Sequence, residues 1–221
     1  MPALQLRTGT WTFIFLEPAE ASDDKELRNI KSDMAIFQKI CSKIFFGWMG
    51  WRENVTVPRH DKCIICVAPH TSNWDFIIAK LYYYWSLGRT AGFLMKKEWF
   101  FWPLGVIFRR MGGIPVFRSQ KCSLTDQLAA RAMEADHFEL AITPEGTRSL
   151  ATTWKRGFYF IALKAKLPIM LYAIDYENRL ISCTRTLIPT GNVEADLKEI
   201  MEYYRPCKAK YPEKFAVEEI D

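Results

Sequence analysis

The chain has 221 residues, of which 49% are hydrophobic and 25% charged, which suits one globular domain of ordinary size. No stretch reaches the ~18 uncharged apolar residues of a membrane-spanning helix, and no signal peptide is evident at the start. We therefore expect a cytoplasmic protein that does not cross a membrane. The formal net charge is +5.

The first 51 residues divide into two segments. Residues 1–33 carry six acids and four bases, and 17–24 are rich in turn formers, so 1–33 is predicted to be a poorly packed extension. Residues 34–51 have apolar side chains at helical spacing and an aromatic end. This N-terminal amphipathic helix is expected either to pack onto the core or to insert into a bilayer interface, and 34–221 form the folded domain.

Strand and helix patterns then alternate along the chain. Strands are predicted at 63–68, 91–95, 114–117, 138–143, 168–175 and 179–188. Helices are predicted at 74–87, 124–135, 154–166 and 193–204, with a broken helical stretch at 99–110. The pattern indicates an α/β fold, a layered single domain with a mostly parallel central sheet flanked by helices.

Positive charge and aromatic residues concentrate in one segment. Residues 76–125 hold eight Lys or Arg and one acid, a net of +7 (8 − 1), with aromatic clusters at 82–85 and 99–102. The clusters could be core, but basic residues among large apolar ones are typical of a surface that meets anionic lipid. We therefore expect a peripheral protein on the inner face of the cell membrane and no binding of nucleic acid, for which no motif is present.

The six cysteines fit a reducing compartment. Cys63 and Cys66 resemble a metal-binding pair flanked by His60 and His70, but they lie in a predicted strand, which would turn the two thiols to opposite sides. No second ligand pair accompanies them, so we expect no metal site and no cofactor.

Polar groups follow four of the predicted strands, where ligands bind in parallel α/β sheets. They are His70 and Asp75, then Lys96, then Arg118, then the run at 145–149. His70 and Asp75 could merely cap the next helix. A histidine held by an acid can also take a proton from a hydroxyl near neutral pH.

At these residues the sequence resembles the glycerolipid acyltransferase family, which includes lysophosphatidic acid (1-acylglycerol-3-phosphate) O-acyltransferases. Four blocks carry the resemblance, over about half the chain: His70 to Asp75 with four residues between, Lys96 to Arg118 with Pro103 and Gly105, the unbroken Pro-Glu-Gly-Thr-Arg-Ser at 144–149, and Leu-Pro-Ile-Met at 167–170. Pro69 and Thr143 stand where the family often has Asn and Phe.

The resemblance implies transfer of a fatty acyl group from acyl-CoA or acyl carrier protein to a lysolipid hydroxyl, with acyl carrier protein as a candidate partner. His70 would be the base and Asp75 its orienting acid, without a covalent acyl-enzyme on Ser72. The expected substrate-binding residues are Lys96, Arg118, Glu145, Gly146, Thr147 and Arg148.

Each of these residues has an expected role. Backbone N–H groups near Gly146, or Lys96, would stabilise the oxyanion, and Arg118 and Arg148 would bind an anionic headgroup. Glu145 would repel phosphate and is expected to hold one of these arginines or a backbone turn. The plain alternatives are a surface ion pair for Arg148 and a helix cap for Thr147.

The expected acceptor is 1-acylglycerol 3-phosphate, which would place the protein in phospholipid biosynthesis. Three alternatives stay open: acylation of a lyso-aminolipid by the same chemistry, hydrolysis by a thioesterase or lipase, and a catalytically silent membrane-binding module. The absence of a Gly-x-Ser-x-Gly motif counts against a lipase.

Overall fold

The computed structural model describes Ile36, Ile40, Lys43 and residues 46–88, 90–116 and 123–217. The expected extension at 1–33 lies outside the described residues. Within the expected helix at 34–51, the described residues Ile36, Ile40, Lys43 and 46–49 are helical. Ile36 and Ile40 are exposed, whereas Phe46 and Trp51 are buried in the core.

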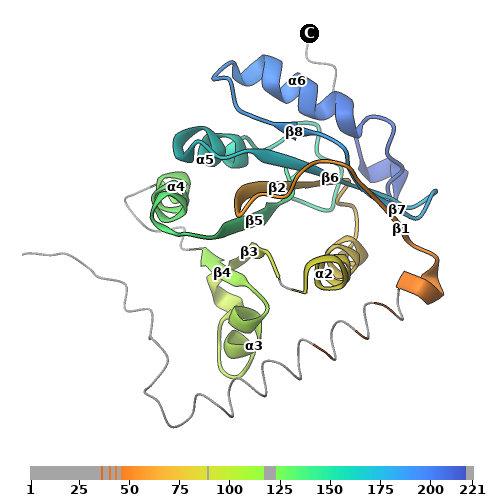
Figure 1. The fold of residues 1–221 in the computed structure, drawn as a ribbon, viewed down its shortest axis with the longest axis horizontal. Coiled ribbons are helices and arrows are strands. Elements are labelled where there is room, and N and C mark those ends of the chain that lie inside the picture. Colours follow the sequence, from red (N-terminus) through yellow and green to blue (C-terminus); the bar gives the residue numbers. More distant parts are fainter. Residues whose placement is uncertain are drawn as a thin grey trace, which may run out of the picture.

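The described residues form an eight-stranded, mostly parallel sheet (Figure 1). Its strands are β1 (Arg52–Val55), β2 (Lys62–Ala68), β3 (Gly92–Lys96), β4 (Gly113–Val116), β5 (Phe138–Ile142), β6 (Ile169–Asp175), β7 (Leu180–Cys183) and β8 (Thr186–Leu187). The order is β1-β7-β6-β2-β5-β3-β4, and β8 pairs with β6. Only the β6–β7 and β6–β8 pairs are antiparallel among those described.

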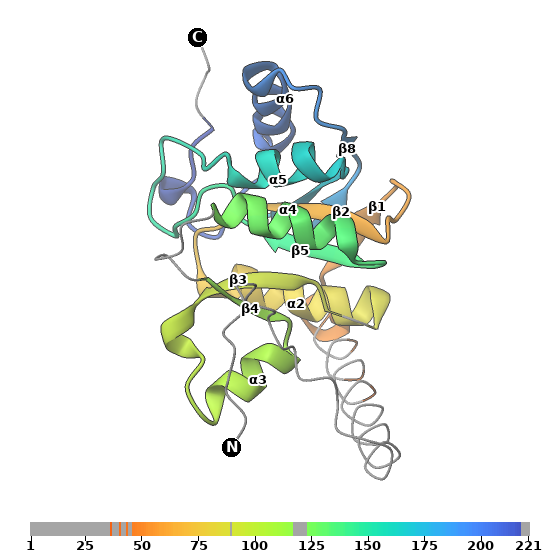
Figure 2. The same cartoon turned by 90° about the vertical axis from the view of Figure 1, so that its left-hand side faces the viewer.

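Helices cover both faces of this sheet (Figures 1 and 2). They are α2 (Asn73–Leu87), α3 (Leu104–Arg110), α4 (Leu124–Glu134), α5 (Gly157–Ala165) and α6 (Val193–Tyr204), with short 3-10 turns η1 (Lys97–Trp99) and η2 (Pro212–Lys214). Helices α4, α5 and α6 share a core on one face, and α2 packs on the other. The predicted fold class, a layered α/β domain with a mostly parallel sheet, is confirmed.

The central strand β2 contributes to both cores because its side chains alternate. Ile64 and Cys66 pack against α4, α5 and α6, whereas Cys63 and Ile65 pack against α2. The two cysteine side chains therefore lie on opposite sides of the sheet, as the strand pattern predicts. Burial raises the pKa of the Cys66 thiol to about 12, so this thiol stays protonated.

The structure corrects several sequence expectations. Strand β1 (Arg52–Val55) was not predicted, and the strand expected at 179–188 is two strands, β7 and β8. The aromatic cluster that begins at Tyr82 is mostly core: Tyr82, Tyr83 and Tyr84 are all buried. These three side chains therefore cannot form the expected membrane-facing surface. Within the part of the chain described, no helix is both long and apolar enough to span a bilayer.

Candidate active site

His70 lies in the short connection between β2 and α2, and Asp75 lies in the first turn of α2. The strand ends at Ala68 and the helix begins at Asn73, so the two side chains flank one tight turn. The His70 Nδ1 lies 3.3 Å from the Asp75 Oδ2, at ion-pair distance but without the alignment of a hydrogen bond. The His70 side chain is 19% exposed and that of Asp75 only 2%. The imidazole is therefore accessible to a ligand, whereas the carboxylate behind it is buried.

Asp75 both caps α2 and faces His70. Its Oδ2 accepts hydrogen bonds from the backbone N–H groups of Thr71 and Ser72, each at 2.7 Å, and its Oδ1 accepts from the Ser72 hydroxyl at 2.9 Å. Together with the bond from the Trp74 N–H to Ser72, these form a capping box. Burial alone would raise the pKa of Asp75, but the donors around it outweigh burial and hold that pKa below its ordinary value. The capping hydrogen bonds therefore contribute to holding the carboxylate that faces the imidazole.

The Ser72 hydroxyl has a structural role in this turn. It donates to Asp75 and accepts from the Trp74 N–H, so both functions of the hydroxyl are engaged at the start of α2. This arrangement agrees with the expectation that no acyl-enzyme forms on Ser72.

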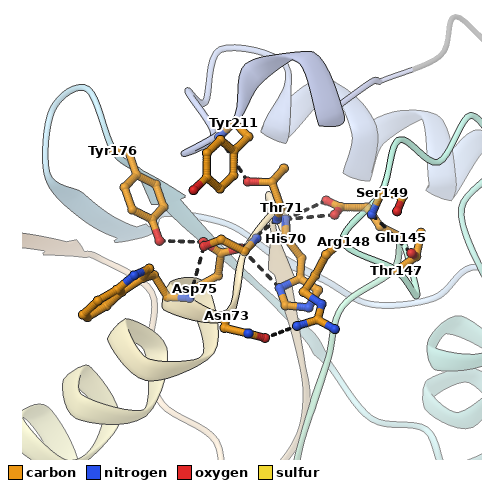
Figure 3. Close-up of polar contacts among 12 residues, drawn as sticks. His70, Thr71, Asn73, Asp75, Glu145, Thr147, Arg148, Ser149, Tyr176 and Tyr211 are labelled. Carbon is orange, nitrogen blue, oxygen red and sulfur yellow. Dashed lines mark hydrogen bonds and ion pairs between the residues drawn. The ribbon is translucent and has the colours of Figure 1, made fainter.

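Glu145 holds the backbone of His70 (Figure 3). The His70 N–H donates to both Glu145 carboxylate oxygens, at 3.0 and 2.9 Å. Of the partners expected for Glu145, the structure therefore favours a backbone group over an arginine. Burial raises the pKa of Glu145 to about 8, with the bond from His70 opposing the shift and the nearby Asp75 adding to it.

Arg148 reaches the same end of the sheet. Its Nη1 donates to the Asn73 Oδ1 at the start of α2, and both residues line the cavity that contains His70 (Figure 3). The structure therefore shows a contact with a side-chain amide in place of the surface ion pair that was the plain alternative for Arg148. Arg148 is exposed, which leaves its guanidinium accessible to an anion.

Gly146 and Thr147 shape the turn between Glu145 and Arg148. Gly146 has a φ of +67°, and a side chain there would press against Lys155. Its N–H donates to the Thr143 carbonyl at 3.2 Å, so this particular group is engaged in the turn. The expectation that N–H groups near Gly146 stabilise the oxyanion stays a prediction. The Thr147 Oγ1 accepts from the Ser149 N–H, so Thr147 stabilises a turn and is not a helix cap.

Lys96 does not line the cavity that contains His70. Lys96 ends β3 at the same edge of the sheet, but two strands away from β2, and it lines a separate hollow with Glu98 and Trp99. Arg118 lies outside the described residues.

A cavity of about 860 Å³ is lined by His70 and by residues of α2, α4, α5 and the sheet. His70, Asn73 and Arg148 line one part of it, and the remaining wall is mainly apolar, with Phe76, Phe93 and Phe108 among its residues. This size and lining are typical of a site for an apolar ligand with one polar end.

Comparison with known proteins identifies the family. The acyltransferase family model matches residues 52–175, more than half of the chain. The chain belongs to the acyltransferase family. The comparison with curated proteins gave no match. Among solved structures, the fold is similar to the crystal structure of the 1-acyl-sn-glycerophosphate (LPA) acyltransferase PlsC from Thermotoga maritima, with 18% identity, a TM-score of 0.58, and coverage of 84% of this chain and 81% of that one.

Two residues of the candidate site were missed by sequence reasoning. Tyr176 donates its hydroxyl to the Asp75 Oδ1 at 2.5 Å, and the Tyr211 N–H donates to the Thr71 Oγ1 at 3.3 Å (Figure 3). Both come from segments more than 100 residues further along the chain, and a single sequence gives no signal for such contacts.

Among the described residues, no group of three or more His, Cys, Asp or Glu side chains is arranged to hold a metal ion. The expectation that the enzyme needs no cofactor stays a prediction.

Proposed function

We propose that this acyltransferase moves a fatty acyl group from a thioester to the free hydroxyl of a lysolipid. One observation carries the proposal: His70, backed by the buried Asp75, lines a large and mainly apolar cavity. The cavity suits an acyl chain, and the imidazole suits removal of a hydroxyl proton. Membership of the acyltransferase family supports the same chemistry.

In the proposed reaction, His70 acts as the general base. A proton on Nδ1, directed at Asp75, leaves the lone pair on Nε2, which takes the proton of the lysolipid hydroxyl. That oxygen attacks the thioester carbonyl carbon, and the tetrahedral intermediate collapses by breaking the C–S bond. The proton on Nε2 passes to the leaving sulfur, so the products are an ester and a thiol. Asp75 stabilises the imidazolium that forms in between.

The acceptor is proposed to carry an anionic group near its hydroxyl. Arg148 lies near His70 and lines the same cavity, and a planar guanidinium binds phosphate through paired hydrogen bonds. These features support 1-acylglycerol 3-phosphate as the acceptor, giving phosphatidic acid. A lyso-aminolipid with a carboxylate would use the same contact and is the second candidate.

The proposal is tested by following thiol release from acyl-CoA with a panel of lysolipids. We expect release that depends on the lysolipid and is fastest with 1-acylglycerol 3-phosphate. In Arg148→Ala, the apparent KM for that acceptor should rise about tenfold, because a charge-assisted contact is lost. The matched control is Arg185→Ala, since Arg185 is exposed, pairs with Glu199 and does not line the cavity.

Three other results have distinct meanings. Release at the same rate without any lysolipid would identify a hydrolase. A preference for a lyso-aminolipid would indicate that Arg148 binds the carboxylate of that acceptor. An unchanged KM in Arg148→Ala would remove this residue from headgroup recognition.

We further propose that the enzyme works at the surface of an anionic membrane, through an aromatic and basic face on η1 and α3. The apolar members of this face are exposed: Trp99, Phe101, Trp102, Val106 and Ile107. Lys96, Lys97, Arg109 and Arg110 accompany them, with Glu98 the single acid among residues 96–110. Phe108 and Met111 of the same segment line the cavity, so lipid bound at this face would lie beside the cavity.

This surface is tested with vesicles of phosphatidylcholine containing phosphatidylglycerol. Replacing both Trp99 and Trp102 by Ser should weaken vesicle binding at least about tenfold, because two large side chains lose their burial in lipid. Ile188→Ser is the control, since Ile188 is 65% exposed but follows β8, away from α3 (Figure 2). Equal binding by the double variant and the wild type would refute the assignment of this face.

A further inference from the structure

The Asp75 carboxylate receives one contact that does not come from its own turn. Thr71 and Ser72 supply the local donors to both of its oxygens. The additional donor is the Tyr176 hydroxyl, 2.5 Å from Oδ1 and 101 residues away along the chain. Oδ1 therefore has two hydroxyl donors, while Oδ2 is the oxygen that faces His70.

Tyr176 is held independently of the site. It directly follows β6, and its backbone N–H donates to the Lys208 carbonyl at 2.9 Å. Its ring meets the Trp51 ring edge-on, with centroids 5.3 Å apart. The preceding Asp175 accepts two hydrogen bonds from Asn178, which fixes the turn into β7. The Tyr176 hydroxyl that contacts Asp75 therefore belongs to a turn held by its own hydrogen bonds and ring packing.

A carboxylate that must keep one particular oxygen toward a neighbouring group needs a contact of this kind. The terminal torsion of Asp is broad and roughly two-fold, so local capping alone allows the two oxygens to shift. A second hydroxyl on Oδ1 resists this rotation and keeps Oδ2 toward the imidazole. The same contact draws negative charge toward Oδ1, which moderates how strongly the carboxylate holds a protonated His70.

We propose that Tyr176 is a positioning residue for the His70–Asp75 pair, fixing the carboxylate so that the imidazole is correctly oriented and readily gives up its proton. This inference rests on the proposed function, because it assigns Tyr176 a role in that proton transfer. Tyr176 acts through Asp75 and is not itself assigned a contact with substrate.

The test compares the steady-state kinetics of Tyr176→Phe with those of the wild type. Phenylalanine keeps the ring packed on Trp51 and removes only the hydroxyl, so the fold is retained. We expect kcat to fall about tenfold, with the KM for the lysolipid changed by less than about twofold. The acid limb of the kcat–pH profile should move to higher pH, because a carboxylate with fewer donors holds the protonated imidazole more strongly.

Other titratable or charged groups face this pair, and the variant leaves them in place. Glu145 contacts the His70 backbone, Arg148 and Lys155 line the same cavity, and Tyr211 lies near Tyr176. If the acid limb of the kcat–pH profile shifts in Tyr176→Phe, the cause is therefore the lost contact between the Tyr176 hydroxyl and Asp75.

Tyr159→Phe is a matched control. The Tyr159 hydroxyl donates to the buried Asp196 at 2.7 Å, in the same kind of pair but between α5 and α6. The Tyr159→Phe substitution should lower thermal stability while leaving kcat and the pH profile unchanged. Wild-type kinetics in Tyr176→Phe, or equal kinetic losses in both variants, would overturn the inference. Absence of lysolipid-dependent release by the wild type would instead overturn the proposed function.

Discussion

Replacement of His70 by alanine is expected to reduce lysolipid-dependent thiol release by about 10²- to 10⁴-fold, the usual contribution of a general base. The alanine variant should fold, because Glu145 holds residue 70 through its backbone N–H, which alanine retains. The loss should appear in kcat, with little change in the KM for the lysolipid, since the imidazole acts on the hydroxyl proton and not on the headgroup.

The two remaining histidines of the chain provide the controls. His60 and His137 lie outside the cavity, and the exposed His137 contacts Glu139. Alanine at either position should leave turnover within about twofold of the wild type. Undiminished turnover in His70→Ala, with unfolding curves matching the wild type, would remove His70 from the mechanism and leave the cavity without its proposed base.

The sequence predicts most of the fold because burial on both sides of parallel strands produces apolar runs such as that of β2. Strand β1 was missed for the opposite reason, since Arg52, Glu53 and Asn54 are exposed at the edge of the sheet and show no such pattern. The strand expected at 179–188 is interrupted at Thr184 and Arg185, which the apolar pattern does not locate.

The site is predictable as far as it depends on short segments. The contact between His70 and Asp75 can be predicted because the two residues are only five positions apart, at the turn from a strand into a helix. The contact between Glu145 and the His70 backbone depends on β2 and β5 being neighbours, and no pattern in the sequence gives that order. The membrane-facing interpretation was wrong for Tyr82 and stays a prediction for the exposed Trp102, because composition does not distinguish buried from exposed aromatic residues.

Replacement of Glu145 by glutamine is expected to stabilise the protein progressively as the pH rises. The pKa of Glu145 is raised from an ordinary 4.5 to about 8 because the carboxyl is buried. Between these values the folded protein keeps a proton that the unfolded chain releases, so the contribution of Glu145 to stability is full below pH 4.5 and is lost as the pH rises through 8. Glutamine does not titrate, and its carbonyl oxygen can still accept from the His70 N–H.

The measurement is the free energy of unfolding in urea at several pH values between 5 and 8. The advantage of Glu145→Gln over the wild type should grow across this range, by at most about 4 kcal/mol. Asp196→Asn is the control: hydrogen bonds from Tyr159 and Thr190 outweigh burial and lower the pKa of Asp196, so that carboxyl stays ionised throughout. Its replacement should destabilise by an amount that is constant between pH 5 and 8. Parallel curves for Glu145→Gln and the wild type would show that Glu145 is already ionised in the folded protein, and that the bond to the His70 N–H outweighs its burial.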